Sequence, residues 1–159
     1  MNPFFRRVLL TALVAGTLDI LTAYTKGFIQ SGHISKRMFQ FIAGGALGLK
    51  DSMAGGIGVI LLGVFFHYFI AFSFTLFFFL IYPKVSILSV NKYVSGLVYG
   101  IFVWLVMNEI VWPLSRLPRY PFNLQNAIIE ALILMVMIGL PISLSAYSYY
   151  RKAPYLKPQ

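Results

Sequence analysis

Cysteine is absent from this sequence of 159 residues, and acidic residues are scarce, with 4 Asp and Glu against 13 Lys and Arg. The absence of cysteine excludes disulfides, thiolate metal sites, iron–sulfur clusters and cysteine nucleophiles. Charged residues make up only 11% of the chain, against about 25% in a typical soluble domain. A chain with so little polar surface is expected in a membrane.

Apolar residues are abundant instead, since 59% of the chain is hydrophobic and 17% is aromatic. A helix needs about 20 mostly apolar residues to cross the hydrocarbon core of a bilayer, because each residue adds about 1.5 Å. Four stretches qualify: residues 8–24, 54–82, 94–112 and 126–150. The sequence therefore predicts an all-α fold, a bundle of four transmembrane helices that forms one integral membrane domain over residues 1–159.

The link between the first two stretches is long, whereas the other two links are short and rich in proline or polar residues. It contains an apolar dozen, residues 38–49, that is too short to span a bilayer. We expect an interfacial helix here, lying along the membrane surface, with a re-entrant segment as the alternative. Ser35, Lys36 and Arg37 stand where they could cap its start.

The N-terminal sequence admits two interpretations. Arg6 and Arg7 followed by an apolar run resemble a signal peptide, but no clean small-x-small cleavage site follows, so we expect a retained helix. Basic residues are almost equally divided between the two sides of the predicted bundle, so the positive-inside rule hardly distinguishes its two possible orientations in the membrane. The basic ends favour both termini in the cytoplasm, while insertion in both orientations, as an antiparallel dimer, stays open.

Three of the polar residues inside the predicted spans are the main candidates: Asp19, His67 and Asn108. An ionisable group at the centre of a spanning helix costs about 2.5 to 3.5 kcal/mol on insertion scales, so it is expected to face the interior, pair, or serve a pathway. Asp19 is either a packing residue held by Thr or Lys26, or a carboxylate that binds protons or a ligand. His67 is either a hydrogen-bonded interior residue or a proton carrier. We take the three as a candidate polar site.

Further candidates lie near the ends of the predicted spans. Lys26, Glu109 and Glu130 form a secondary set, in which Glu109 is expected to reach Arg116 or the lipid headgroups. Small residues at helical spacing let two helices approach closely. The glycines expected at such contacts are Gly16, Gly63, Gly96 and Gly100.

Several kinds of site find no support in the sequence. His33, the only other histidine, lies in the long link, so a haem site with two axial histidines is not expected. No phosphate-binding loop motif occurs, and scattered carboxylates make a poor metal or acid–base site. We predict no catalytic residue, no metal, no cofactor and no nucleic-acid partner. The predicted partners are the lipid bilayer and either a second copy of the chain or a larger membrane protein.

Five short strings carry a family resemblance: Gly16-x-x-Asp19, Phe39-Gln40-x-Ile42-Ala43-x-Gly45-x-Leu47-Gly48, Leu62-Gly63-x-x-x-His67, Gly96-x-x-Tyr99-Gly100 and Met107-Asn108-x-x-Val111-x-Pro113-Leu114-Ser115. Over about residues 16–141, the chain resembles a group of uncharacterised small bacterial membrane proteins that look similar to the YagU type, which is linked with acid resistance. The resemblance implies a multi-pass protein of the bacterial inner (cytoplasmic) membrane without a settled activity. Some members carry a histidine where this chain has Leu134, so a mechanism with two histidines is not implied.

Three functions follow as hypotheses. The first is a non-enzymatic membrane protein whose polar interior supports proton-linked transport or a role in envelope or acid stress. The second is a structural or accessory subunit that docks a larger membrane complex through its small-residue faces. The third is a membrane enzyme, which the scattered ionisable residues disfavour.

Overall fold

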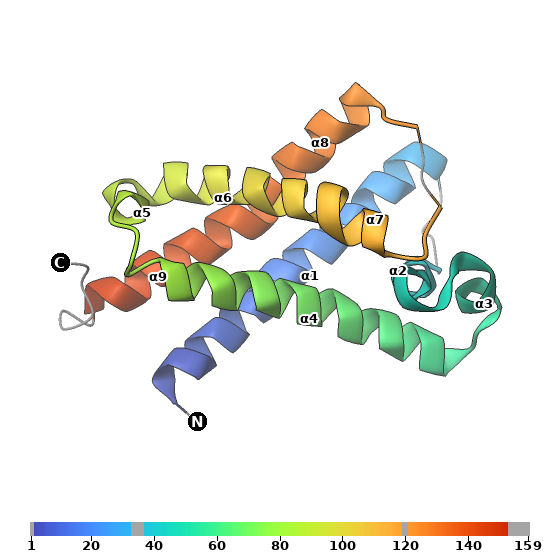
Figure 1. Cartoon of the computed structure of the whole chain (residues 1–159), viewed down its shortest axis with the longest axis horizontal. Coiled ribbons are helices and arrows are strands. Elements are labelled where there is room, and N and C mark those ends of the chain that lie inside the picture. Colours follow the sequence, from blue (N-terminus) through green and yellow to red (C-terminus); the bar gives the residue numbers. More distant parts are fainter. Residues whose placement is uncertain (1, 33–36, 119–120, 153–159) are drawn as a thin grey trace.

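The computed structural model describes residues 2–32, 37–118 and 121–152, and every regular element within these ranges is helical. Four long helical segments run along the molecule (Figure 1). They are α1 (Pro3–Ser31), α4 (Ile57–Ile81), the run of α6 (Lys92–Val106), η1 (Met107–Val111) and α7 (Trp112–Leu114), and the run of α8 (Leu124–Leu134), η2 (Met135–Gly139) and α9 (Leu140–Lys152). Each contains a stretch that is long and apolar enough to cross a membrane. The prediction of an all-α chain with four long apolar helices is confirmed.

The first helix is longer at both ends than the predicted stretch 8–24. It begins at Pro3, where the Asn2 side chain caps it by accepting the backbone N–H of Phe4 at 3.0 Å. It ends at Gly32, whose left-handed backbone (φ 72°) lets its N–H bond the Phe28 carbonyl. Hydropathy located only the apolar part, because capping groups outside that part decide where a helix stops.

The predicted helix over residues 38–49 is replaced by two shorter helices, α2 (Met38–Leu47) and α3 (Leu49–Ala54). Gly48 separates them with a φ of 89°, a conformation that favours glycine. The chain breaks again at Gly55 and Gly56, so α4 begins at Ile57 and not at residue 54. The expected capping residues Ser35 and Lys36, together with His33, lie outside the described residues.

Two segments of π-helix interrupt the third and fourth long segments. In η1 the Trp112 N–H bonds the Met107 carbonyl, and in η2 the Leu140 N–H bonds the Met135 carbonyl, five residues back in each case. A proline follows each of these donors directly in the sequence, and proline offers no N–H for the usual α-helical bond. The wide turns therefore lie where proline disrupts the regular hydrogen-bond pattern.

The two ends of the bundle differ in how they are packed. The start of α1, the ends of α4 and α9, and the start of α6 lie at one end of the molecule, and α2, α3 and α7 lie at the other (Figure 1). The hydrophobic core occupies the end of the molecule that holds the termini, and its members are Val8, Ala15, Phe78, Phe79, Tyr82, Tyr99, Val103, Ile138, Ile142, Ala146 and Tyr150. The half near α2 holds a cavity instead.

Candidate functional site

A cavity of about 400 Å³ lies between the four long segments and α2. Most of its lining side chains are apolar. The polar and charged residues that line it are Asp19 and Lys26 from α1, His67 from α4, Asn108 from η1 and Glu130 from α8. The structure therefore brings the three predicted polar residues to one cavity, together with two of the three secondary candidates.

Asp19 is half-buried on the face of α1 that also contributes Ala23 and Lys26 to the cavity. These three residues follow at spacings of four and three, which place them on one side of a helix. Among the described residues, no group donates a hydrogen bond to the Asp19 carboxylate. The expected partner Lys26 is instead paired with another acid, so Asp19 is left as a carboxylate that borders the cavity.

His67 joins α4 to α1. Its Nε2 lies 2.8 Å from the backbone oxygen of Gly16, one helical turn before Asp19. Because a carbonyl oxygen only accepts, Nε2 must carry the hydrogen and donate it. The ring also meets the rings of Phe39 and Tyr68 edge-on, with centroids 6.5 and 5.2 Å away. His67 is thus a hydrogen-bonded interior residue and a cavity-lining residue at once.

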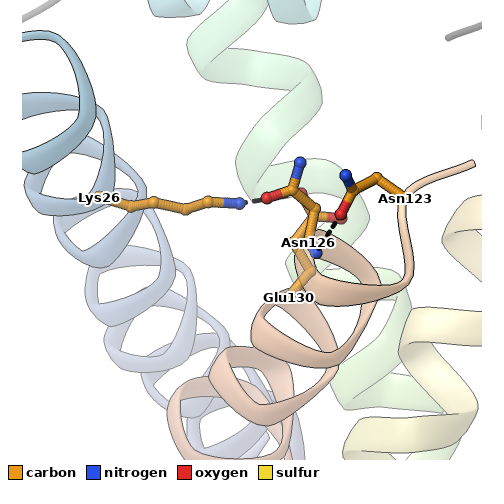
Figure 2. Close-up of polar contacts among 4 residues, drawn as sticks. All are labelled: Lys26, Asn123, Asn126 and Glu130. Atoms are coloured by element: carbon orange, nitrogen blue, oxygen red, sulfur yellow. Dashed lines mark hydrogen bonds and ion pairs between the residues drawn. The ribbon is translucent and has the colours of Figure 1, made fainter. Parts of the chain in front are cut away.

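An ion pair crosses the bundle at the cavity. Figure 2 shows Lys26 of α1 reaching across to Glu130 of α8, with Nζ and Oε1 separated by 2.9 Å. The side chains are 23% and 46% exposed, respectively. Asn123 caps α8 by accepting the N–H of Asn126 at 2.9 Å, and Glu130 lies nearly two turns inside that helix, which begins at Leu124. Glu130 therefore has a protein partner within the bundle.

A second cavity of about 430 Å³ adjoins the first. The two share four lining residues: Trp104, Asn108, Trp112 and Glu130. Glu109 lines only the second cavity, where it is exposed, and it forms no ion pair with Arg116 within the described part of the chain. Asn108 donates from Nδ2 to the Trp104 carbonyl at 2.9 Å and borders both cavities. It lies in a π-helical turn, a feature frequent at functional sites.

The four glycines chosen from the sequence all stand at contacts between segments of this chain. A Cβ added at Gly16 would lie 3.1 Å from the Tyr68 ring, and one at Gly96 would lie 3.0 Å from the Gly139 carbonyl oxygen. The backbone of Phe39 fills the space beside Gly63, and that of Met135 fills the space beside Gly100. These small residues let α1, α2, α6 and η2 approach their neighbours closely.

Sequence reasoning missed two kinds of lining residue. Both tryptophans of the chain, Trp104 and Trp112, line the cavity, and Trp104 follows Gly96 and Gly100 at four-residue spacing in the sequence. Met38 and Ile42 come from α2, which the sequence placed at the membrane surface. The four-residue spacing along the third span was the signal for Trp104, whereas no pattern pointed to α2.

Within the described residues, no cluster of three or more His, Cys, Asp or Glu side chains is placed to hold a metal ion. Comparisons of the chain with protein-family models, with curated proteins and with solved structures found no match.

Proposed function

We propose that the chain is an integral membrane protein with four spans and that its interior cavity serves proton-linked transport of a small solute. The outer face of α4 supports the membrane assignment, because Leu61, Phe65 and Phe69 follow one another at four-residue spacing and are 61, 59 and 55% exposed. Large apolar side chains on an outer face suit contact with lipid. We assign the protein to the bacterial inner membrane, with a role in envelope or acid stress, on the family resemblance alone.

The observation that carries the transport proposal is the cavity itself. It collects Asp19, His67 and Asn108 from three of the proposed spans. Ionisable residues inside a membrane are costly and mark ion, proton or substrate pathways more often than other positions do. Two of these three groups can exchange protons, and Asp19 has no hydrogen-bond donor among the described residues. A titratable carboxylate beside a cavity is what coupling of a solute to a proton requires.

The rival function, an accessory subunit, receives less support. It relies on small-residue faces that are free to dock a partner. Gly16, Gly63, Gly96 and Gly100 instead contact other segments of the same chain. These faces are occupied within the protein, so they offer no open surface for a second membrane protein.

The proposal is tested in vesicles that contain the purified protein and a trapped pH-sensitive dye. Cationic, neutral and anionic organic solutes are applied in turn under a pH gradient. At least one solute class should move protons through the wild type. Asp19→Asn should abolish this flux, because asparagine keeps the volume but cannot ionise. Asp51→Asn is the matched control, since Asp51 is exposed on α3 and lines neither cavity.

Two results would overturn the proposal. One is a wild type that moves no protons with any solute class. The other is an Asp19→Asn variant that is as active as the wild type. A drop in protein abundance with Asp19→Asn, without activity in the wild type, would assign Asp19 to packing.

A further inference from the structure

We propose that the cavity beside Asp19 binds a small organic cation with an apolar body about the size of one ring, and that this cation exchanges there for a proton. The inference names the substrate class of the transport function and rests on that proposed function.

Charge is divided unevenly between the cavities and the rest of the chain. The sequence has 13 basic and only 4 acidic residues, yet three of the acidic ones, Asp19, Glu109 and Glu130, line the two adjoining cavities. Among the described residues, Lys26 is the one Lys or Arg that lines either cavity. Most of the few acidic residues of this basic chain therefore line these two cavities.

Among the charged groups of the first cavity, the one without a partner is a carboxylate and not an ammonium group. Lys26 is satisfied by Glu130 at 2.9 Å. The Nε2 of His67 is taken by the Gly16 carbonyl. Asp19 alone borders the first cavity without a donor among the described residues. A carboxylate that accepts no hydrogen bond, in mostly apolar surroundings, favours a cationic ligand and repels an anionic one.

The lining selects an organic cation over an inorganic one. Hard metal cations take several oxygen ligands, whereas the walls around Asp19 are mostly apolar, with Phe74, Trp104 and Trp112 among them. Aromatic rings, tryptophan best of all, attract a cation whose charge is only weakly hydrated. A volume of about 400 Å³ lies near the lower limit of small-molecule sites, which limits the ligand to about one ring.

A proton and the cation compete for the same carboxylate. The charged or titratable groups that line the cavity around Asp19 are Lys26 on α1, His67 on α4 and Glu130 on α8. The α2 and η1 helices contribute only uncharged side chains to it, among them Met38, Ile42 and Asn108. As the pH falls, protonation neutralises the Asp19 carboxylate and removes the charge that attracts the cation, so acid should release it.

Tryptophan fluorescence gives a direct measurement, because both tryptophans of the chain line the first cavity. The purified full chain in mild detergent is titrated with benzyltrimethylammonium. Its uncharged counterpart neopentylbenzene, in which carbon replaces the nitrogen, and the anion 4-tert-butylbenzoate serve as matched probes. The cation should change the fluorescence saturably, at least about tenfold more tightly than either other probe, which equals about 1.4 kcal/mol. Its affinity should fall as the pH is lowered.

Three variants locate the binding site. Asp19→Asn should lower the affinity for the cation by at least about tenfold. Asp19→Glu keeps the charge and should retain binding, so it tests the site even when the asparagine variant folds poorly. Ala23→Leu should block binding without changing any charge, since Ala23 lies one turn from Asp19 and lines the cavity. Asp51→Asn should bind as the wild type does.

Equal affinity for the cation and neopentylbenzene would overturn the inference, as would a preference for the anion or full binding by Asp19→Asn. Absence of any saturable change would overturn it as well. These outcomes are independent of the vesicle experiment. Proton flux driven by neutral or anionic solutes would leave the transport function standing while this substrate class fails.

Discussion

At the scale of single residues, the ion pair between Lys26 and Glu130 is a long-range polar contact that the sequence does not reveal. The two residues are separated by 104 positions. Glu130 is 46% exposed in the isolated chain, so water screens the pair in detergent and its contribution stays below that of a buried pair. The partner left behind by a single substitution would still border an apolar cavity.

A double-mutant cycle measures this contact. Lys26→Met and Glu130→Gln should each lower the free energy of unfolding by on the order of 1 kcal/mol, between the values for exposed and buried pairs. The double variant should recover most of one loss, because neither charge is left alone. Equilibrium unfolding in mixtures of mild detergent and dodecyl sulfate gives the free energies. Strictly additive losses would mean that the two side chains do not interact, and Lys26→Arg, which keeps the charge, is the control.

At the scale of elements, the contact between α2 and α4 depends on a single glycine. The backbone of Phe39 occupies the position where a side chain at Gly63 would begin. Backbone atoms cannot move aside as the end of a flexible side chain can. The aromatic ring of Phe39 packs beside His67 through this contact, so the position of α2 also sets the environment of the candidate site.

Gly63→Ala should therefore displace α2 and destabilise the protein. Gly58→Ala is the matched control in the same helix, since no atom lies within 4 Å of the position of its added Cβ. Alanine is favoured over glycine in a helix by roughly 0.5 to 1 kcal/mol, so the control should be neutral or slightly stabilising. The midpoint of unfolding in mild detergent separates the two variants. Equal midpoints would contradict the close contact of α2 with α4.

At the scale of the whole molecule, the hydrophobic core packs the half near the start of α1, and the first cavity lies in the half near α2, although Val103 and Ile138 belong to both. In the packed half, Tyr99 and Tyr150 donate their hydroxyl hydrogens to the Phe74 and Phe79 carbonyls at 2.6 and 2.7 Å, which ties α6 and α9 to α4. The cavity lies in the other half, where α2 and α7 complete the wall. Under the proposed function, solute and proton would exchange in the half that holds the cavity.

Two isoleucines in the fourth long segment test this asymmetry. Ile142 is fully buried in the core, whereas Ile133 is half-buried and lines the cavity. Ile142→Ala should cost about 2 to 5 kcal/mol of unfolding free energy, as large-to-small changes in packed cores do. Ile133→Ala should cost less than half as much, because fewer atoms pack against it. The same detergent unfolding assay measures both, and equal losses would mean that the two halves are packed alike.

Topology is the second prediction at this scale. The start of α1 and the end of α9 lie at one end of the bundle, and α7 lies at the other (Figure 1). Reporter fusions at residue 159 and in the link 113–121 should give opposite signals, with the termini in the cytoplasm. Equal and mixed signals at both sites would support insertion in both orientations.

The sequence alone determined the number and approximate places of the four long helices, because apolar length is a local property of the chain. It also indicated Asp19, His67 and Asn108 as interior candidates, since polar groups are costly inside a long apolar helix. The ends of the helices were harder to predict from the sequence, because caps such as Asn2 and Gly32 lie outside the apolar stretch.

Only the tertiary structure decided which of these residues border one cavity. The rotation and packing of helices that are distant in sequence bring Lys26 to Glu130 and place Asp19, His67 and Asn108 around one cavity. The division of the link into α2 and α3 likewise depends on the positive φ of Gly48 and on contact with α4. Hydropathy averages the polarity of all residues in a segment, whereas a binding site depends on which sides of the segments face one another.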